Sequence, residues 1–171
     1  MNDPTIVAEP ARWLGETIGF WIQTVILAIS AGAGILIIKS RGKQEARRAT
    51  VDFIVEQRRD AELTNAKTAI RGMHENHEAN FARHLQDPTS DEYKAILIVL
   101  NNYEFAASGI RTHAFDDDVY KRLRFSTVIR DWEALKGFVA DFRNQKSKNT
   151  LFQDFEWLYE QWRKKPLTPD S

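Results

Sequence analysis

The sequence contains no cysteine, and it has only five prolines and eight glycines in 171 residues. Without cysteine, disulfide bonds, thiolate nucleophiles and cysteine-ligated metal sites are excluded. This suits a reducing compartment, although many exported proteins also lack cysteine. Pro88 is the only proline between Pro10 and Pro166. Because no stretch alternates apolar and polar residues over the length of a strand, we expect an all-α fold.

The chain also has no excess of charge of either sign, since 24 Lys and Arg residues balance 24 Asp and Glu residues. Balanced charge gives no general reason to expect nucleic acid as a partner. A glycine-rich phosphate loop is absent too, because the close pair Gly32 and Gly34 lies within an apolar run. No serine nucleophile is accompanied by a base. We therefore expect no cofactor and no enzymatic activity.

One long apolar run stands out against this polar background. Residues Ile18 to Ile38 include no charged side chain, and their polar members are Gln23, Thr24 and Ser30. As a helix, these roughly 21 residues rise about 31 Å, which matches the hydrocarbon core of a bilayer. A cleavable signal peptide would carry its basic residues before the run, and a buried or interfacial helix is the other alternative. The run predicts a retained transmembrane helix.

The charges on the two sides of this run differ in sign. Asp3, Glu9 and Glu16 precede it, and basic residues follow it. Because Lys and Arg near a span stay in the cytoplasm, the N-terminus is expected outside and the C-terminal part in the cytoplasm. No aromatic residues are interleaved with the basic ones, so we expect contacts with lipid headgroups and not with nucleic acid. The basic residues are Lys39, Arg41, Lys43, Arg47 and Arg48.

Small residues within the run suggest a surface for helix packing. Ala28 and Gly32 are four residues apart, and so are Ser30 and Gly34. This spacing lets two membrane helices approach closely, although Gly and Ala are common in such helices in any case. It favours association with other membrane proteins or with a second copy of the chain.

Beyond the basic residues, apolar side chains recur at helical spacing in several segments. Capping residues mark the expected helix starts: Thr89 or Ser90, the acids at 116–118, and Asn149 or Thr150. A break is expected near Asp60. The expected helices cover residues 45–60, 65–85, 92–113, 116–142 and 150–165. Short connections between them predict a small helical bundle.

These features divide the chain into five expected parts. The bundle, at 61–165, is long enough to form a single core. The parts are a short extracytoplasmic N-terminus at 1–17, the transmembrane helix at 18–38, a basic juxtamembrane helix at 39–60, the bundle, and a disordered tail at 166–171.

Three histidines close together raise the question of a metal site. His74, His77 and His84 lie within about three helical turns, beside Glu75 and Glu78. Helical zinc and iron sites use such offsets, but the pattern is not His-Glu-x-x-His and no matching motif occurs elsewhere. The surrounding segment is the most polar of the expected helices. We treat the histidines as weak candidates on a solvated face and expect no metal.

Polar residues also interrupt the expected third helix. Asn101, Tyr103 and Glu104 lie in an otherwise apolar stretch, and Arg111 is seven residues beyond Glu104. Arg130 and Asp131 on the next helix can supply partners. The pattern predicts a polar network between helices, which either fixes their register or forms a binding site.

Four segments together resemble a bacterial family catalogued as a domain of unknown function, number four-seven-six-zero. They are ATVDFIVEQRRDAEL, ILIVLNNYEFAASGIR, IRDWEALKGFVADFR and LFQDFEWLYEQW, between Ala49 and Trp162. The resemblance implies one N-terminal membrane span followed by a helical domain. It brings no known reaction, cofactor or partner.

The sequence thus favours a single-pass protein of the bacterial inner membrane whose cytoplasmic domain acts as an interaction or scaffold module. Its expected partners are the lipid bilayer and other membrane proteins or itself. One alternative is an accessory subunit of a larger membrane complex. Another is a metal-dependent effector, for instance in phage exclusion, that would use His74 and His77.

Overall fold

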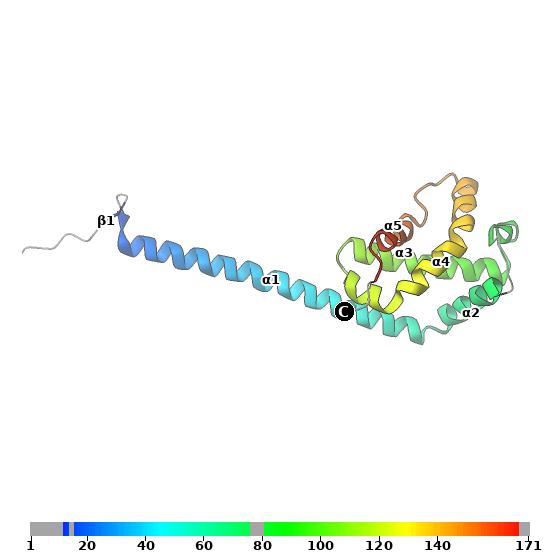
Figure 1. The fold of residues 1–171 in the computed structure, drawn as a ribbon, viewed down its shortest axis with the longest axis horizontal. Helices are drawn as coiled ribbons and strands as arrows, with labels where there is room; N and C mark the ends of the chain where they lie inside the picture. Colours follow the sequence, from blue (N-terminus) through cyan, green and yellow to red (C-terminus); the bar gives the residue numbers. More distant parts are fainter. Residues whose placement is uncertain (1–11, 14–15, 76–80, 168–171) are drawn as a thin grey trace, which may run out of the picture. The chain divides into compact units, whose positions relative to one another are not determined.

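The computed structural model describes residues 12–13, 16–75 and 81–167, and it gives only the backbone for residues 12, 13, 16–19 and 32–40. A two-residue antiparallel ladder pairs Arg12 with Thr17, and the other regular elements of the described residues are helices. The all-α class is therefore confirmed at this level (Figure 1). The elements are β1 (Arg12–Trp13), β2 (Glu16–Thr17), α1 (Ile18–Arg59), α2 (Ala61–Glu75), the 3-10 helix η1 (Phe81–Gln86), α3 (Asp91–Arg111), α4 (Asp117–Lys146) and α5 (Gln153–Lys164).

The chain divides into two compact units, Met1–Lys43 and Gln44–Ser171. Residues 44–60, expected as part of a separate juxtamembrane helix, group with the bundle. Among the described residues, no helix combines the length and the apolar character needed to cross a membrane. The assignment of residues 18–38 as a membrane span therefore stays a prediction.

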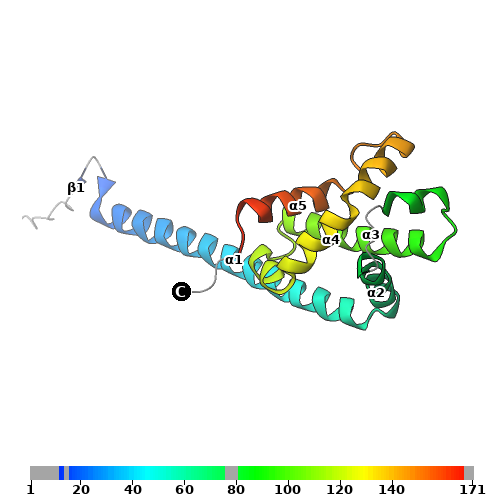
Figure 2. The ribbon, with the colours of Figure 1, turned by 45° about the vertical axis from the view of Figure 1, so that its right-hand side comes forward.

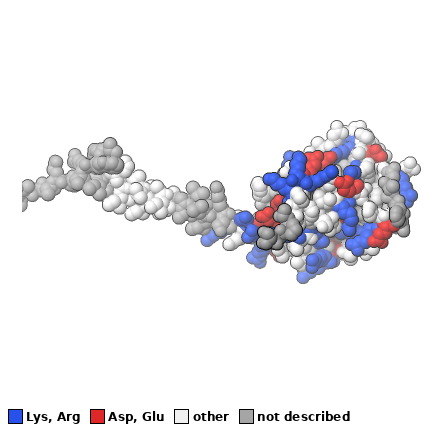
Figure 3. Space-filling model, viewed as in Figure 1, with Lys and Arg blue, Asp and Glu red and all other residues white. Residues whose placement is uncertain are grey.

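Within the first unit, α1 exposes its large apolar side chains. Leu27 is 73% exposed and Ile29 is 66% exposed. The described middle of this part of α1 has no charged surface, whereas positive and negative side chains alternate over the second unit (Figure 3). The other exposed large apolar residues of this stretch are Phe20, Ile22, Val25 and Ile26.

The break between α1 and α2 falls where the sequence predicts it. Asp60 separates the helices, and its side-chain oxygen accepts a hydrogen bond of 2.9 Å from the backbone N–H of Leu63. This bond satisfies a free donor of the first turn of α2. The expected single helix at 65–85 is wrong at its C-terminal end, because residues 81–86 form a 3-10 helix. Phe81 is buried there and anchors this turn to the core.

Two of the three predicted caps are present. The Ser90 side chain accepts from the backbone of Tyr93 at 3.2 Å, and Asp116 accepts from the backbone of Val119 at 3.0 Å. The prediction for α5 is wrong, because Phe152 precedes this helix with a left-handed φ of 56° and makes no side-chain cap. A side chain from α3 supplies the missing acceptors, as described below.

The core lies around α3, which contacts α2, α4, α5 and η1. In both ribbon views α3 runs between α2 and α5 (Figures 1 and 2). The ring of Phe155 stacks on Tyr103 at 4.6 Å and meets Trp132 edge-on at 4.9 Å. Such pairs contribute about 0.5–1.5 kcal/mol each beyond burial. Gly109 allows the close approach of Phe115, whose ring carbon would lie 2.3 Å from an added Cβ.

Candidate functional site

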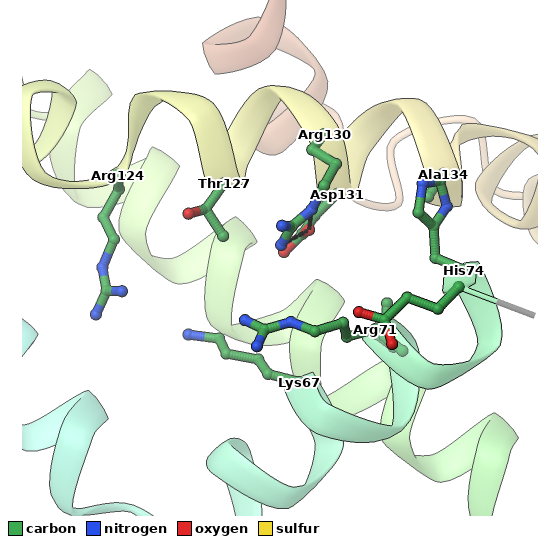
Figure 4. A pocket seen from close by; sticks show the side chains of 10 residues that line it. Lys67, Arg71, His74, Arg124, Thr127, Arg130, Asp131 and Ala134 are labelled. Carbon is green, nitrogen blue, oxygen red and sulfur yellow. Dashed lines mark hydrogen bonds and ion pairs between the residues drawn. The ribbon is translucent and has the colours of Figure 1, made fainter.

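A cavity of about 390 Å³ lies between α2 and α4. Both helices contribute long charged side chains to its wall, so that the lining is unusually rich in cations. Figure 4 shows side chains from the two helices extending into the space between them. The charged residues of the lining are Lys67, Arg71 and Glu75 on α2 and Arg124, Arg130 and Asp131 on α4.

Asp131 is buried at one side of the cavity and is fully engaged with protein donors. The Tyr103 hydroxyl donates to its Oδ2 atom at 2.6 Å. The Nε and Nη2 atoms of Arg130 donate to its Oδ1 atom at 3.0 and 2.9 Å. Burial, together with the nearby Asp131 carboxylate, raises the pKa of Tyr103 well above its usual value. Tyr103 therefore stays protonated and acts as a permanent donor to Asp131.

A second chain of polar groups leads from the cavity to α1. Nη2 of Arg124 donates to the Gln57 side-chain oxygen at 3.3 Å, and the Gln57 amide donates to Asn102 at 2.8 Å. The Arg124 Nε atom and the Tyr120 hydroxyl are buried without a hydrogen-bond partner among the described residues. Burial raises the pKa of Tyr120 to about 12, so its hydroxyl also stays protonated.

The ammonium group of Lys67, at the wall of the cavity, has a lowered pKa. Burial, and then repulsion by Arg124, lower its pKa from 10.5 to about 8, although Asp131 and Asp60 oppose this shift. Its ammonium lies 5.6 Å from the centre of the Tyr103 ring, over the ring face. Such cation–π contacts replace part of the lost hydration. Lys67 is thus held charged at neutral pH without an ion-pair partner among the described residues.

Glu104 and Arg111 belong to a different cluster, at the start of α5. The Glu104 carboxylate accepts from the backbone N–H groups of Asp154 at 3.2 Å and Phe155 at 2.8 Å. Arg111 bonds the Asp154 carboxylate at 2.6 Å and lies over the Trp157 ring. Two α3 residues seven positions apart therefore share one partner, Asp154. This arrangement docks α5 on α3 and does not form part of the cavity.

The predicted polar network is thus divided in the structure. Tyr103, Arg130 and Asp131 come together at the cavity, and Asn101 is exposed, with its neighbour Asn102 taking part instead. Sequence reasoning missed the cavity residues Lys67, Arg71 and Arg124, and it missed Gln57, which accepts a hydrogen bond from Arg124. Lys67 and Arg71 are four residues apart on one face of α2, and that spacing could have suggested a shared site. Without the position of α4, it resembles any solvated face.

The structure describes only part of the histidine cluster. His74 lines the cavity, and His84 lies in η1. His77 and Glu78 are outside the described residues. In the part of the chain that the structure describes, no group of three or more His, Cys, Asp or Glu residues is arranged to hold a metal ion.

Two of the predicted lipid contacts have acidic partners within the protein. Nε of Arg47 pairs with the buried Asp116 carboxylate at 3.1 Å, and Arg48 lies 3.9 Å from Asp52. Arg47 therefore holds the start of α4 in addition to any contact with lipid. The remaining basic residues are Arg41 and Lys43, both exposed, and Lys39, whose side chain is outside the described residues.

The predicted packing surface on α1 is described only in its first half. Ala28 and Ser30 are exposed, and the Ser30 hydroxyl donates to the backbone oxygen of Ile26 at 2.8 Å. The hydroxyl is therefore satisfied within its own helix. For Gly32 and Gly34 the structure describes only the backbone, so the second half of the predicted packing surface lies outside what is described.

The fold and the cavity define a small helical-bundle protein with a cation-rich cavity between two of its helices. The chain belongs to the family described as Domain of unknown function (DUF4760), whose model matches residues 23–162. This match confirms the predicted family and extends it towards the N-terminus from Ala49. No curated protein and no solved structure matches the chain significantly.

Proposed function

We propose that the chain is a single-pass, membrane-anchored interaction module, with residues 18–38 in a bacterial inner membrane and the bundle on its cytoplasmic side. In this proposal the protein binds other proteins, or a second copy of itself, and does not catalyse a reaction. Anchoring confines the bundle to the membrane surface and raises its effective concentration towards other membrane proteins.

One observation carries the proposal: large apolar side chains are exposed along α1 between Phe20 and Ile29. Moving one such side chain out of water is favourable by about 1.5–3 kcal/mol. Six of them on one helix, within a run that contains no charged residue, would be costly in water and favourable in lipid. The basic residues that follow the run support the cytoplasmic placement of the bundle.

The bundle also exposes large apolar side chains of its own. Phe105 on α3 is 60% exposed and Leu123 on α4 is 54% exposed. Aromatic residues are enriched at the centres of protein interfaces, and apolar side chains that are exposed in the free protein gain from burial against a partner. These two positions are therefore suitable for locating a partner.

The test is photo-crosslinking in native membranes. A photoreactive phenylalanine analogue is placed separately at Phe105, Leu123, Leu27 and, as a control, the exposed α5 residue Glu160, and adducts are identified by mass spectrometry. We expect a reproducible protein adduct from Phe105 or Leu123 and none from Glu160. Lipid adducts alone from Leu27 would support a lone anchor, whereas a protein adduct there would favour the accessory-subunit alternative. A chain that forms no protein adduct at any position would contradict the proposal.

A further inference from the structure

The cavity between α2 and α4 has more positive charge than its own acids can compensate. Among the described lining residues, four cationic side chains face two carboxylates. Asp131 is already engaged by Arg130 and Tyr103. Neither Lys67 nor Arg71 has an ion-pair partner among the described residues. The described part of the lining therefore has a net positive charge that favours an anion.

The donors of the cavity come from both sides. In Figure 4 the Lys67 and Arg71 side chains of α2 lie across the cavity from Thr127 and Arg130 of α4. Guanidinium groups bind the oxygens of phosphate in pairs, and ammonium groups bind them as point charges. Donors that approach from two helices suit a tetrahedral oxyanion better than a planar one.

The size and the lining of the cavity limit the class of ligand. About 390 Å³ is at the lower end of the range for small-molecule sites. Phe, Tyr and Trp are absent from the described lining residues, and the ring there is the imidazole of His74. A nucleobase would therefore find only a small stacking surface, and Ile70 and Ala134 supply only small apolar contacts. We infer that this cavity binds a phosphate monoester on a small, non-aromatic molecule.

This inference does not depend on the membrane anchor or on a protein partner. A phosphate monoester can come from a soluble metabolite or from the headgroup of phosphatidic acid, and the cavity chemistry is the same for both. A bound dianion would also favour the charged form of Lys67, whose pKa is lowered in the free protein. Binding near pH 8 should accordingly be accompanied by proton uptake.

Titration calorimetry on the full chain in neutral detergent tests the inference. The probes are inorganic phosphate and glycerol 3-phosphate, with glycerol as the neutral reference. We expect saturable binding of one phosphate group per chain at pH 7, and none of glycerol. Arg71→Gln should weaken binding about tenfold or more, because a charge-assisted hydrogen bond is lost. Arg71 is exposed and has no ion-pair partner among the described residues, so this change should leave the fold intact.

Two controls make the result specific. Arg58→Gln removes an exposed arginine from α1, outside the cavity lining, and should leave the affinity unchanged. Lys67→Met removes a second cation of the lining and should also weaken binding. Absence of phosphate binding by the wild-type chain, or an equal loss in the Arg58 variant, would overturn the inference.

A further arm identifies the source of the phosphate. The full chain is placed in nanodiscs that contain either phosphatidic acid or phosphatidylcholine, and glycerol 3-phosphate is titrated into each. Competition by phosphatidic acid that disappears in Arg71→Gln assigns the site to a lipid headgroup. Equal binding in both nanodiscs assigns it to a soluble ester.

Discussion

Lys67 and Asp131 lie on the same cavity, but their charges are stabilised differently. Asp131 receives hydrogen bonds from a tyrosine and an arginine, so that its ionised form is well compensated. Lys67 has a ring face and two more distant carboxylates, against the repulsion of Arg124. Its charge consequently lowers the stability of the folded chain at neutral pH.

The sign of this effect follows from proton binding. The pKa of Lys67 is about 8 in the folded protein, against an ordinary value of 10.5. Between these values the unfolded chain binds more protons, so the free energy of unfolding rises with pH. Below about pH 8 both states are protonated and the destabilisation is fully present. Above pH 10.5 it is relieved.

Lys67→Met should therefore increase the free energy of unfolding at pH 7 by about 1–2 kcal/mol, a range reduced for the partial exposure of the side chain. The gain should shrink as the pH rises from about 8 to 10.5. Urea unfolding of the full chain in neutral detergent, followed by tryptophan fluorescence, measures both effects. Lys164→Met, on an exposed residue of α5, is the control. A gain that stays constant with pH would contradict the assignment.

At the scale of elements, α5 depends on another helix for its start. Its first turn has free backbone donors, as every helix does, and Phe152 offers no side-chain acceptor. Glu104 supplies two acceptor oxygens from α3. Burial raises the pKa of Glu104, and the two backbone hydrogen bonds oppose that shift. Glu104 therefore both caps the start of α5 and holds α5 against α3.

Glu104→Ala should lower the free energy of unfolding by about 1–2 kcal/mol, because two donors at the start of α5 lose their acceptor. Glu104→Gln retains one side-chain oxygen and should cost less. Glu160→Ala, on an exposed position of the same helix, should change stability little. Hydrogen exchange provides a local reading, with faster exchange expected in the first turn of α5. Unchanged exchange there in Glu104→Ala would contradict the capping role.

At the scale of the whole molecule, a membrane anchor would place the two ends of the chain on opposite sides of the bilayer. The chain has no cysteine, so one introduced thiol reports on one position without background. Asn2→Cys reports on the N-terminus, and Lys164→Cys reports on the bundle.

In cells whose outer membrane has been made permeable, an impermeant maleimide should label Asn2→Cys without lysis. It should label Lys164→Cys only after the inner membrane is broken, because positively charged flanks stay in the cytoplasm. Extraction with alkaline carbonate should leave both variants in the membrane fraction. Labelling of both before lysis, or release by carbonate, would count against the anchor.

Much of the helical layout was predictable because it depends on local chemistry. The break at Asp60 and the caps at Ser90 and Asp116 need only a side-chain oxygen close to its own helix start. The membrane anchor is also predicted from local composition, and it stays a prediction. Local rules were wrong at 81–86 and at the cap of α5, where a buried phenylalanine and a glutamate about fifty residues away decide the outcome.

The sequence by itself determined the all-α class, most helix boundaries and the family, since periodicity, capping residues and characteristic segments are properties of short stretches of chain. Only the tertiary structure decided which polar residues meet. It joined Tyr103 and Asp131 across 28 positions, separated Glu104 from them, and brought Lys67 opposite Arg124. The physical reason is that the charge of a cavity is a sum over helices, and it exists only once those helices have packed.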